Sequence, residues 1–275
     1  MPYYRLDDGV IYYETFGVGE KWLVLIHGMF ASGRWWKVQI EALSKKYRLL
    51  VPDLRGHGRS SPLERRVKLS KFSQDVYQLM SSLGVEKAVF VGWSLGGLVS
   101  LDLASRHPEL TKGVVLVASR ARRSFIRIAK VLGDYLRGKL YAAYATLFFT
   151  PSETQRLMRQ FIVREIEKEL ARRREEVVSW IVEEVVKNRV ENPIAVIMSA
   201  LLSDVRNRLK YVKAPVLIIA GGRDRSLPPK YSIEIYKKIP TSRLVVLEDC
   251  GHYAPVECGE EVNRLISNFL TEIGW

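Results

Sequence analysis

Six short apolar runs recur along this chain, and they constrain its fold more than any other feature of the sequence. The runs are three to five residues long and lie at residues 22–26, 49–51, 88–91, 114–117, 216–219 and 244–247. A strand that is apolar at every position has both faces buried, as in a parallel sheet covered by helices. Helical patterns lie between the runs, for example at residues 72–83 and 95–105. This alternation predicts an α/β fold with a mostly parallel central sheet and helices on both faces.

The first residues of the chain show a different pattern. Residues 3–6 and 10–16 have the composition of two short strands, and the turn Asp7-Asp8-Gly9 joins them. We therefore expect the sheet to begin with an antiparallel pair.

Residues 119–212 interrupt the alternation, because they contain no apolar run of the buried-strand type. Asn192 directly before Pro193 is instead typical of the start of a helix. We expect a helical cap at residues 119–212, inserted before the last two strands, and a core made of residues 1–118 and 213–275.

The composition is that of a soluble globular protein, since 47% of the 275 residues are hydrophobic and 27% are charged. No apolar run approaches the roughly 18 residues of a membrane span, and the opening residues are polar. The two cysteines, Cys250 and Cys258, predict neither a disulfide framework nor a zinc site, and Cys250 is interpreted as a small buried filler. These features indicate a cytoplasmic protein in a reducing compartment. Few Asn and Gln beside abundant Arg, Lys and Glu are typical of a thermostable protein.

The net charge of +13 indicates an acidic partner, so its distribution along the chain matters. The predicted cap carries +8, against +5 for residues 1–118 and 0 for residues 213–275. Five basic residues lie where the cap begins, namely Arg120, Arg122, Arg123, Arg127 and Lys130. A solvated basic helix face explains this cluster as well as a binding surface does. We do not expect nucleic-acid binding, because no recognition motif accompanies the charge.

The most specific motif is Gly92-Trp93-Ser94-Leu95-Gly96, a G-x-S-x-G pattern between a predicted strand and a predicted helix. Its glycines permit a sharp turn with a strained serine, whose Oγ is then presented above the sheet edge. The strand and helix on either side separate this motif from ordinary glycine-rich turns. Ser94 is therefore our candidate nucleophile.

A serine hydroxyl needs a base, and the chain offers four histidines. His107 lies at the end of a predicted helix, and His27 and His57 lie in loops that each could brace by hydrogen bonding. His252 follows the last predicted strand, at the carboxyl edge of the sheet where such folds place their reacting groups. We therefore expect His252 to be the base.

Two carboxylates compete for the role of orienting that base. Asp224 follows the predicted strand at residues 216–219, whereas Asp249 lies only three residues before His252 and could bond local backbone instead. One helix and one strand fit between Asp224 and His252, which returns the chain to the same edge. We expect Asp224 to orient the base.

Catalysis also requires donors for the developing oxyanion. The backbone N–H of Leu95, directly after the candidate nucleophile, is one donor. The loop at residues 27–30 is expected to supply the other, from Met29 or alternatively from Phe30. Aromatic and sulfur side chains near the motifs predict an apolar substrate pocket, although side chains of this kind also build ordinary cores. They are Phe30, Trp35, Trp93, Phe148, Phe149 and Met158.

Five segments together resemble the α/β-hydrolase superfamily over nearly the whole chain except the predicted cap. They are residues 27–28, 53–60, 92–97, 215–224 and 251–252. The resemblance implies Ser94 as nucleophile, Asp224 as acid, His252 as base, and Met29 with Leu95 as oxyanion donors. It implies no cofactor and no metal. The serine at the elbow is unlike the dehalogenase and epoxide-hydrolase branches, which carry a carboxylate there.

Residues 92–100 are also similar to the elbow of the pimeloyl-acyl-carrier-protein methyl ester esterases. That similarity implies an acidic acyl-carrier protein as a partner of the basic cap residues, beside a small-molecule ester as substrate. We expect a serine hydrolase that cleaves carboxylic esters through an acyl-enzyme intermediate. The same triad also suits hydrolysis of carbon–carbon bonds or lactones and perhydrolysis, and a ligand-binding protein with little turnover is an alternative of another class.

Overall fold

The computed structural model describes residues 2–123 and 190–275, together with the short stretches 133, 136–138, 140, 179–181 and 183–184. Of the residues predicted above, Arg127, Lys130, Phe148, Phe149 and Met158 lie outside this set. Within the described part, no helix combines the length and apolarity needed to cross a bilayer.

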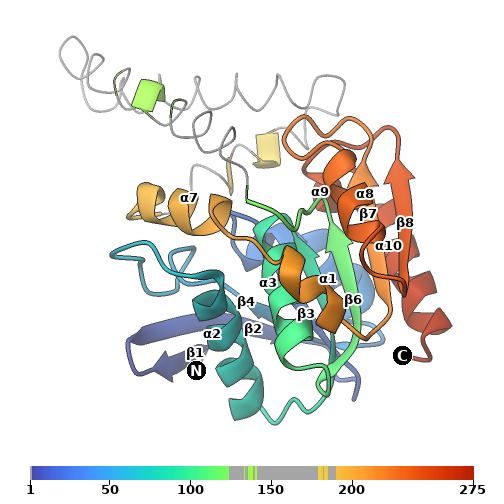
Figure 1. Cartoon of the computed structure of the whole chain (residues 1–275). Coiled ribbons are helices and arrows are strands. Elements are labelled where there is room, and N and C mark those ends of the chain that lie inside the picture. The colour runs from blue at the N-terminus through green and yellow to red at the C-terminus, as the bar shows by residue number, and fades with distance from the viewer. Residues whose placement is uncertain are drawn as a thin grey trace.

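Eight strands of the described chain form one sheet, in the spatial order β1-β2-β4-β3-β5-β6-β7-β8 (Figure 1). The strands are β1 (Tyr3–Leu6), β2 (Gly9–Phe16), β3 (Trp22–Ile26), β4 (Arg48–Pro52), β5 (Ala88–Trp93), β6 (Thr111–Val117), β7 (Val216–Gly221) and β8 (Ser242–Leu247). Strand β2 pairs antiparallel with both β1 and β4, and all other neighbours are parallel. The expected mostly parallel sheet with an antiparallel start is confirmed.

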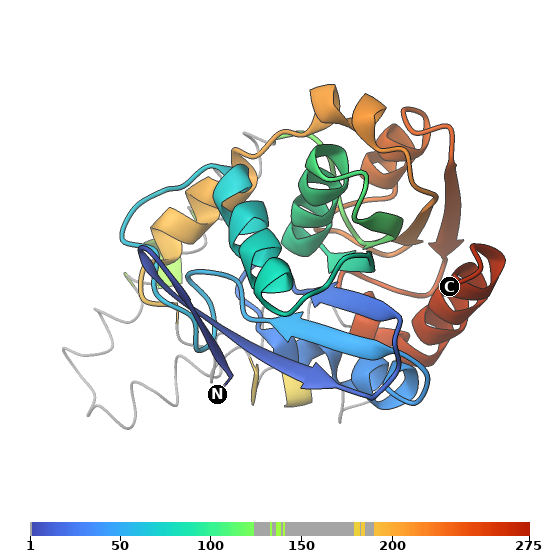
Figure 2. The same cartoon turned by 90° about the horizontal axis from the view of Figure 1, so that it is seen from below.

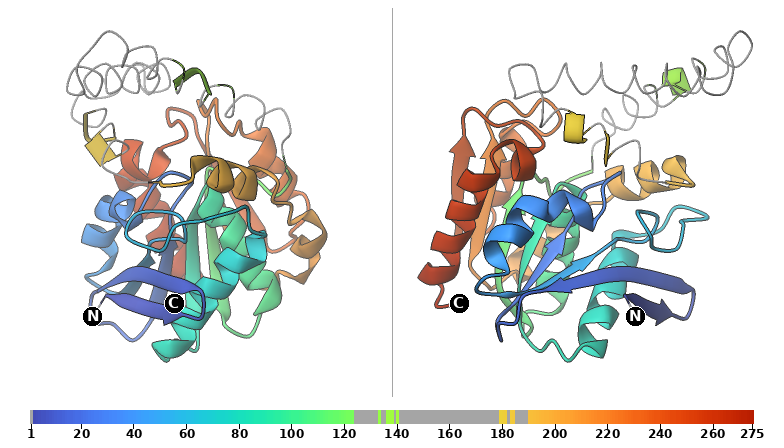
Figure 3. Two further views of the ribbon diagram at one scale, coloured as in Figure 1. Left: turned by 90° about the vertical axis from the view of Figure 1, so that its left-hand side faces the viewer. Right: turned by 180° about the vertical axis from the view of Figure 1, so that it is seen from behind.

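Helices cover both faces of the sheet, as the left view of Figure 3 shows. Successive residues of the central strands alternate between two cores: Leu23 and Leu25 enter one, and Val24 and Ile26 enter the other. This double burial explains why these strands are apolar at every position. One core lies under α1 (Lys37–Leu43) and α10 (Gly259–Glu272), and the other under α2 (Leu69–Ser82), α3 (Leu95–Arg106) and α8 (Lys230–Tyr236).

The segment 119–212 connects two strands that are direct neighbours, β6 and β7. Its last part is described and contains α7 (Pro193–Leu201) and the 3-10 helix η2 (Arg206–Tyr211). Asn192 caps α7, because its side-chain oxygen accepts a hydrogen bond from Ala195 N at 3.1 Å. The predicted helix start is confirmed, whereas the cap as a unit stays a prediction.

The carboxyl ends of the parallel strands meet at one edge of the sheet. Ser94 follows β5 directly, Asp224 follows β7, and His252 follows β8. Figure 2 shows the sheet from below, with the β1–β2 hairpin at one border and α10 at the opposite side. The topology therefore brings three residues to one edge although 158 positions separate the first from the last.

Candidate active site

Ser94 lies in a sharp turn between β5 and α3, with φ of 54° and ψ of −109°. A non-glycine residue with positive φ is strained and persists only where its surroundings hold it. Ser94 N donates to Val117 O at 3.0 Å on the neighbouring strand, and Gly97 N donates to Ser94 O at 3.2 Å. A Cβ at Gly96 would lie only 1.9 Å from Ile26 O, so the turn requires glycine there. These constraints present the Ser94 side chain at the sheet edge.

The His252 side chain joins Ser94 to Asp224. Ser94 Oγ lies 3.2 Å from His252 Nε2, and His252 Nδ1 lies 2.8 Å from Asp224 Oδ2. A carboxylate only accepts, so Nδ1 carries the proton and donates to Asp224. Nε2 is then an acceptor for the Ser94 hydroxyl. The exposed fractions of His252 and Asp224 are 9% and 3%, which shields this chain of hydrogen bonds from water.

The loop after β7 orients Asp224 in turn, because Leu227 N donates to Asp224 Oδ1 at 2.5 Å. The rival carboxylate, Asp249, has a side chain that is 78% exposed and forms an ion pair with Arg223. The structure thus brings Asp224, and not Asp249, to the Nδ1 atom of His252.

The loop at residues 27–30 borders the nucleophile. A Cβ at Gly28 would lie 3.2 Å from Ser94 Cβ, so this backbone passes close to the reacting hydroxyl. Phe30 has a positive φ of 62°, and Met29 and Phe30 are both half-buried against the core. Leu95 N lies at the start of α3, where N–H groups have no partner within the helix. The role of Met29 and Leu95 as oxyanion donors stays a prediction.

The His27 side chain links the loop at residues 27–30 to Leu54 by two hydrogen bonds. Leu54 N donates to His27 Nε2 at 2.9 Å, so the proton is on Nδ1, which donates to Gly28 O at 2.8 Å. Burial lowers the pKa of His27 to about 4. Burial, reinforced by the nearby His27, lowers the pKa of His57 to about 3. Both imidazoles are therefore neutral parts of the scaffold at pH 7.

Two of the predicted pocket residues, Trp35 and Trp93, pack against each other in the core. Trp93 stacks on Trp35 with ring centroids 5.1 Å apart, and both indoles are almost completely buried in one core. Trp35 also contacts Trp180 and Tyr253, at 5.4 Å and 5.6 Å between centroids. Sequence reasoning overlooked Trp180 and Tyr253, because no motif marks them. A role for Phe30, Trp35 and Trp93 in substrate binding stays a prediction.

Cys250 and Cys258 form a disulfide, with Cα atoms 6.2 Å apart. The sequence predicted no disulfide framework, and the structure has this single bridge, so the interpretation of Cys250 as a simple filler was wrong. Only two cysteines are needed for a single bridge, and the fold of residues 250–258 brings them together around His252. The argument for a reducing compartment from cysteine usage therefore loses its basis.

The described residues of the basic cluster make contacts within the protein. Arg120 is 3% exposed and donates to Ala200 O at 2.7 Å and to Ser203 O at 3.2 Å. The half-exposed Arg122 lies 3.2 Å from a carboxylate oxygen of Glu234. Arg123 pairs with Asp204 at 3.7 Å. Arg120 thus fastens the start of the 119–212 segment to its end and does not face solvent.

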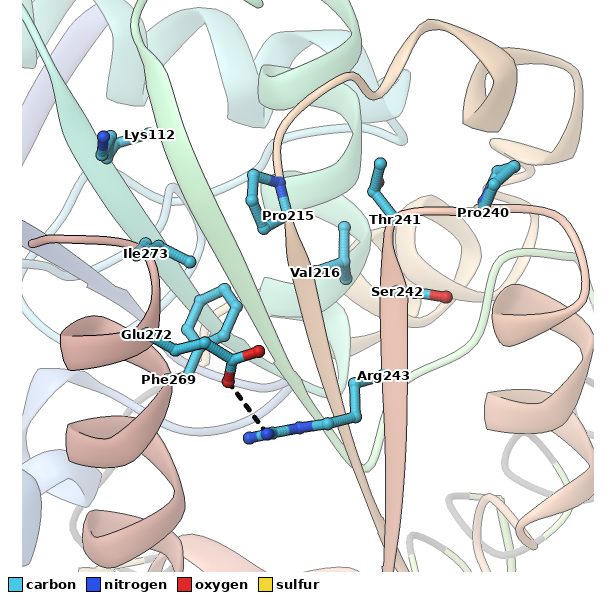
Figure 4. A pocket seen from close by; sticks show the side chains of 10 residues that line it. All are labelled: Lys112, Pro215, Val216, Pro240, Thr241, Ser242, Arg243, Phe269, Glu272 and Ile273. Atoms are coloured by element: carbon cyan, nitrogen blue, oxygen red, sulfur yellow. Dashed lines mark hydrogen bonds and ion pairs between the residues drawn. The ribbon is translucent and has the colours of Figure 1, made fainter.

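A pocket of about 500 Å³ opens at the opposite edge of the sheet (Figure 4). It lies where β7 and β8 begin, at Val216 and Ser242, and its lining includes Arg243 and Glu272, which form an ion pair of 2.9 Å. Each of these strands spans six residues, or roughly 20 Å, before it reaches the edge that carries Asp224 and His252. This pocket is therefore separate from the Ser94 site. Among the residues with described positions, no group of three or more His, Cys, Asp or Glu could hold a metal ion.

A family model described as alpha/beta hydrolase fold matches residues 21–257. The chain is 32% identical to the pimeloyl-[acyl-carrier protein] methyl ester esterase of Nitrosomonas europaea, over 88% of this chain and 92% of that protein. It is 31% identical to the 2-hydroxy-6-oxo-6-phenylhexa-2,4-dienoate hydrolase of Comamonas testosteroni, over 97% and 93%. The enol-lactonase from Burkholderia xenovorans LB400 superposes with a TM-score of 0.79 at 26% identity, covering 98% of this chain and all of the other.

Proposed function

Since the chain belongs to the alpha/beta-hydrolase family, we propose that it is a serine hydrolase that cleaves carboxylic esters through an acyl-enzyme intermediate. The observation that carries this proposal is the hydrogen-bonded chain from Ser94 through His252 to Asp224. This order of groups activates a serine nucleophile: the imidazole takes the proton of the hydroxyl, and the buried carboxylate orients the imidazole.

In the acylation step, Ser94 Oγ attacks the carbonyl carbon of the ester while its proton passes to His252 Nε2. The imidazolium that forms is stabilised by the ionised Asp224. We assign the oxyanion to the N–H groups of Met29 and Leu95. The tetrahedral intermediate collapses when the bond to the alcohol oxygen breaks, and that oxygen takes the proton from His252.

In the deacylation step, a water molecule attacks the acyl carbon and gives one proton to His252 Nε2. The bond to Ser94 Oγ then breaks, and His252 returns the proton to that oxygen. The acid is released and the enzyme is regenerated. Every proton transfer uses Nε2, because Asp224 keeps the other nitrogen protonated throughout.

Covalent labelling and turnover test this proposal together. A fluorophosphonate probe is expected to modify the wild-type protein at Ser94, and a panel of p-nitrophenyl esters is expected to show steady turnover. Ser94→Ala should lose both signals. Ser82→Ala is a matched control, because Ser82 lies on α2 and its hydroxyl donates to Leu79 O. A wild-type protein with neither labelling nor turnover would leave the ligand-binding alternative in its place.

The other reactions of the same triad are separated by substrate. A lactone tests for lactone hydrolysis, and 2-hydroxy-6-oxo-6-phenylhexa-2,4-dienoate tests for hydrolysis of a carbon–carbon bond. An ester assayed with hydrogen peroxide tests for perhydrolysis. Carboxylic ester hydrolysis is supported if kcat/KM is highest for simple esters. A preference of tenfold or more for one of the other substrates would reassign the reaction while keeping Ser94 as the nucleophile.

An ester carried on an acidic acyl-carrier protein is our second candidate substrate. It is favoured by the +8 charge of residues 119–212, which we propose form the cap over the site. Similarity to the esterase of Nitrosomonas europaea points the same way. Arg122 and Arg123 have side chains that are 43% and 52% exposed, so a partner can reach them beside their ion pairs.

Charge substitution tests this candidate. Arg122→Glu/Arg123→Glu is expected to lower kcat/KM for an acyl-carrier-protein methyl ester and to flatten its salt dependence, because charge complementarity acts mainly on association. The kcat/KM for a short p-nitrophenyl ester should not change. Equal efficiency of the variant and the wild type on the carrier substrate would limit the proposal to small esters.

A further inference from the structure

The loop that carries His252 is closed by a covalent bond and by hydrogen bonds around the histidine. The disulfide joins Cys250, just before the histidine, to Cys258, just after the short helix α9 (Ala254–Glu257). Trp93 Nε1 donates to the carbonyl oxygen of His252 at 2.8 Å. The residue directly before the nucleophile thus holds the backbone of the base.

The Glu257 side chain holds the same backbone from the other side. Its Oε2 accepts a hydrogen bond from Gly251 N at 3.0 Å, and its Oε1 accepts one from Tyr253 N at 2.8 Å. These two N–H groups belong to the residues immediately before and after His252. A single carboxylate therefore fixes the main chain on both sides of the imidazole. Hydrogen bonds of this kind, to an ionised acceptor, are about twice as strong as neutral ones.

Gly251 leaves the space that this arrangement needs. A Cβ at position 251 would lie 3.0 Å and 3.1 Å from the two carboxylate oxygens of Glu257. A side chain there would press directly on the carboxylate. Any side chain at position 251 therefore requires the Glu257 carboxylate to shift by a few tenths of an ångström.

We propose that Glu257 is a positioning residue for His252, acting through the two flanking backbone amides. The inference rests on the proposed function, in which His252 is the base. The torsions of residues 251–253 decide where the imidazole points, and its Nε2 must stay near the 3.2 Å at which it faces Ser94 Oγ. A displacement of about 1 Å at a reacting group can cost 100-fold in rate. Glu257 does not touch the substrate in this scheme.

The substitution Glu257→Gln tests the proposal with little change in shape. The amide keeps one acceptor oxygen and turns an NH₂ group toward the second backbone N–H. We expect kcat on p-nitrophenyl esters to fall roughly tenfold or more, with KM changed less than twofold. The rate of fluorophosphonate labelling at Ser94 should fall by a similar factor. Glu261→Gln is the matched control, because Glu261 lies nearby on α10 and pairs with Arg264 on the surface.

A second variant tests the same contact if the Glu257→Gln variant is poorly folded. Gly251→Ala retains the carboxylate and its charge but crowds it, so it should lower kcat and the labelling rate in the same way. Trp93→Phe removes the third hydrogen bond and should add to either effect. Thermal unfolding of each variant, followed by circular dichroism, identifies the folded fraction on which kcat is calculated.

The outcomes separate the inference from the proposed function. Wild-type activity with a fall in kcat in both variants supports the positioning role. The positioning role is overturned if the Glu257→Gln variant has the same kcat and labelling rate as the Glu261→Gln variant, or if only its KM rises. Either result leaves the proposed hydrolase function standing. A wild-type protein that neither turns over esters nor labels at Ser94 would instead remove the proposed function on which the inference depends.

Discussion

Two segments meet at the candidate active site, and their backbones are held by different means. The nucleophile turn at residues 92–97 is held mainly by main-chain hydrogen bonds, from Ser94 N to Val117 O on β6 and from Gly97 N to Ser94 O, and the hydroxyl of Ser119 also donates to Ser94 O. The His252 loop is held by side chains from several parts of the molecule: Asp224, Trp93 and Glu257, together with the disulfide. The nucleophile is thus positioned mainly by backbone groups, and the base largely by side chains from other elements.

This difference predicts different responses to substitution. Removing the side chain of a reacting residue abolishes the reaction. Removing one contact of the His252 loop leaves the other contacts in place. We therefore expect very large effects from the reacting residues and graded effects from the contacts that hold the loop.

The largest effect should come from the reacting pair itself. Ser94→Ala and His252→Ala are each expected to lower kcat by roughly 10⁵-fold or more, because neither residue works without the other. The double variant should be hardly slower than either single variant. Stopped-time ester assays on all three proteins measure this. If the fold decreases of the two single variants multiply in the double variant, Ser94 and His252 act independently and do not form one reacting pair.

Asp224 should give the next largest effect. Asp224→Asn is expected to lower kcat by about 10⁴-fold while the protein stays folded, because a neutral amide favours the wrong tautomer or orientation of the imidazole. Asp249→Asn should change kcat less than twofold, since its carboxylate is exposed and bonded to Arg223. The opposite ranking in ester assays would transfer the orienting role to Asp249.

Acid should act on the scaffold behind the nucleophile. His27 and His57 have an ordinary pKa of 6.5 when unfolded, and burial lowers the pKa of the folded residues to about 4 and about 3. Above pH 6.5 both states are neutral at these sites and stability is full. Below it the unfolded chain takes up protons that the folded chain refuses, so the free energy of unfolding falls as the pH drops toward 4. Each residue contributes about 2 kcal/mol of this loss at pH 5.

Urea denaturation at pH 7 and at pH 5 measures this loss. The variant His57→Gln should lose less stability between the two pH values than the wild type does, because one buried imidazole is gone. An identical decline in both proteins would show that other groups cause it.

The smallest effect should come from the disulfide. Cys250→Ser/Cys258→Ser is expected to lower the free energy of unfolding by about 2.5 kcal/mol, as the chain-entropy relation gives for a loop of this length. Ester turnover of the folded variant should fall less than tenfold, because Trp93 and Glu257 still hold the backbone of His252. Unchanged stability would mean that the bridge constrains neither the unfolded chain nor the loop. A loss of turnover as large as that of Asp224→Asn would show that the loop has one dominant support.

The basic cluster shows where reasoning from sequence reached its limit. The sequence pattern groups Arg120 with four other basic residues as a candidate surface, yet its guanidinium is buried and bonded to Ala200 O and Ser203 O. Those two acceptors lie 80 or more positions away in the sequence. No local pattern around Arg120 distinguishes a buried arginine with carbonyl partners from a solvated one.

The sequence by itself determined the sheet, its direction and the residues at its carboxyl edge. Apolar runs indicate strands buried on both faces, G-x-S-x-G between a strand and a helix indicates the turn at Ser94, and parallel strands must end at a common edge. These signals are local or follow from topology, so Ser94, Asp224 and His252 could be predicted together. Tertiary structure alone decided that Cys250 meets Cys258, that Glu257 spans His252, and that Arg120 turns inward. Such contacts depend on the path of irregular loops, where side chains find their partners only after the surrounding elements have packed.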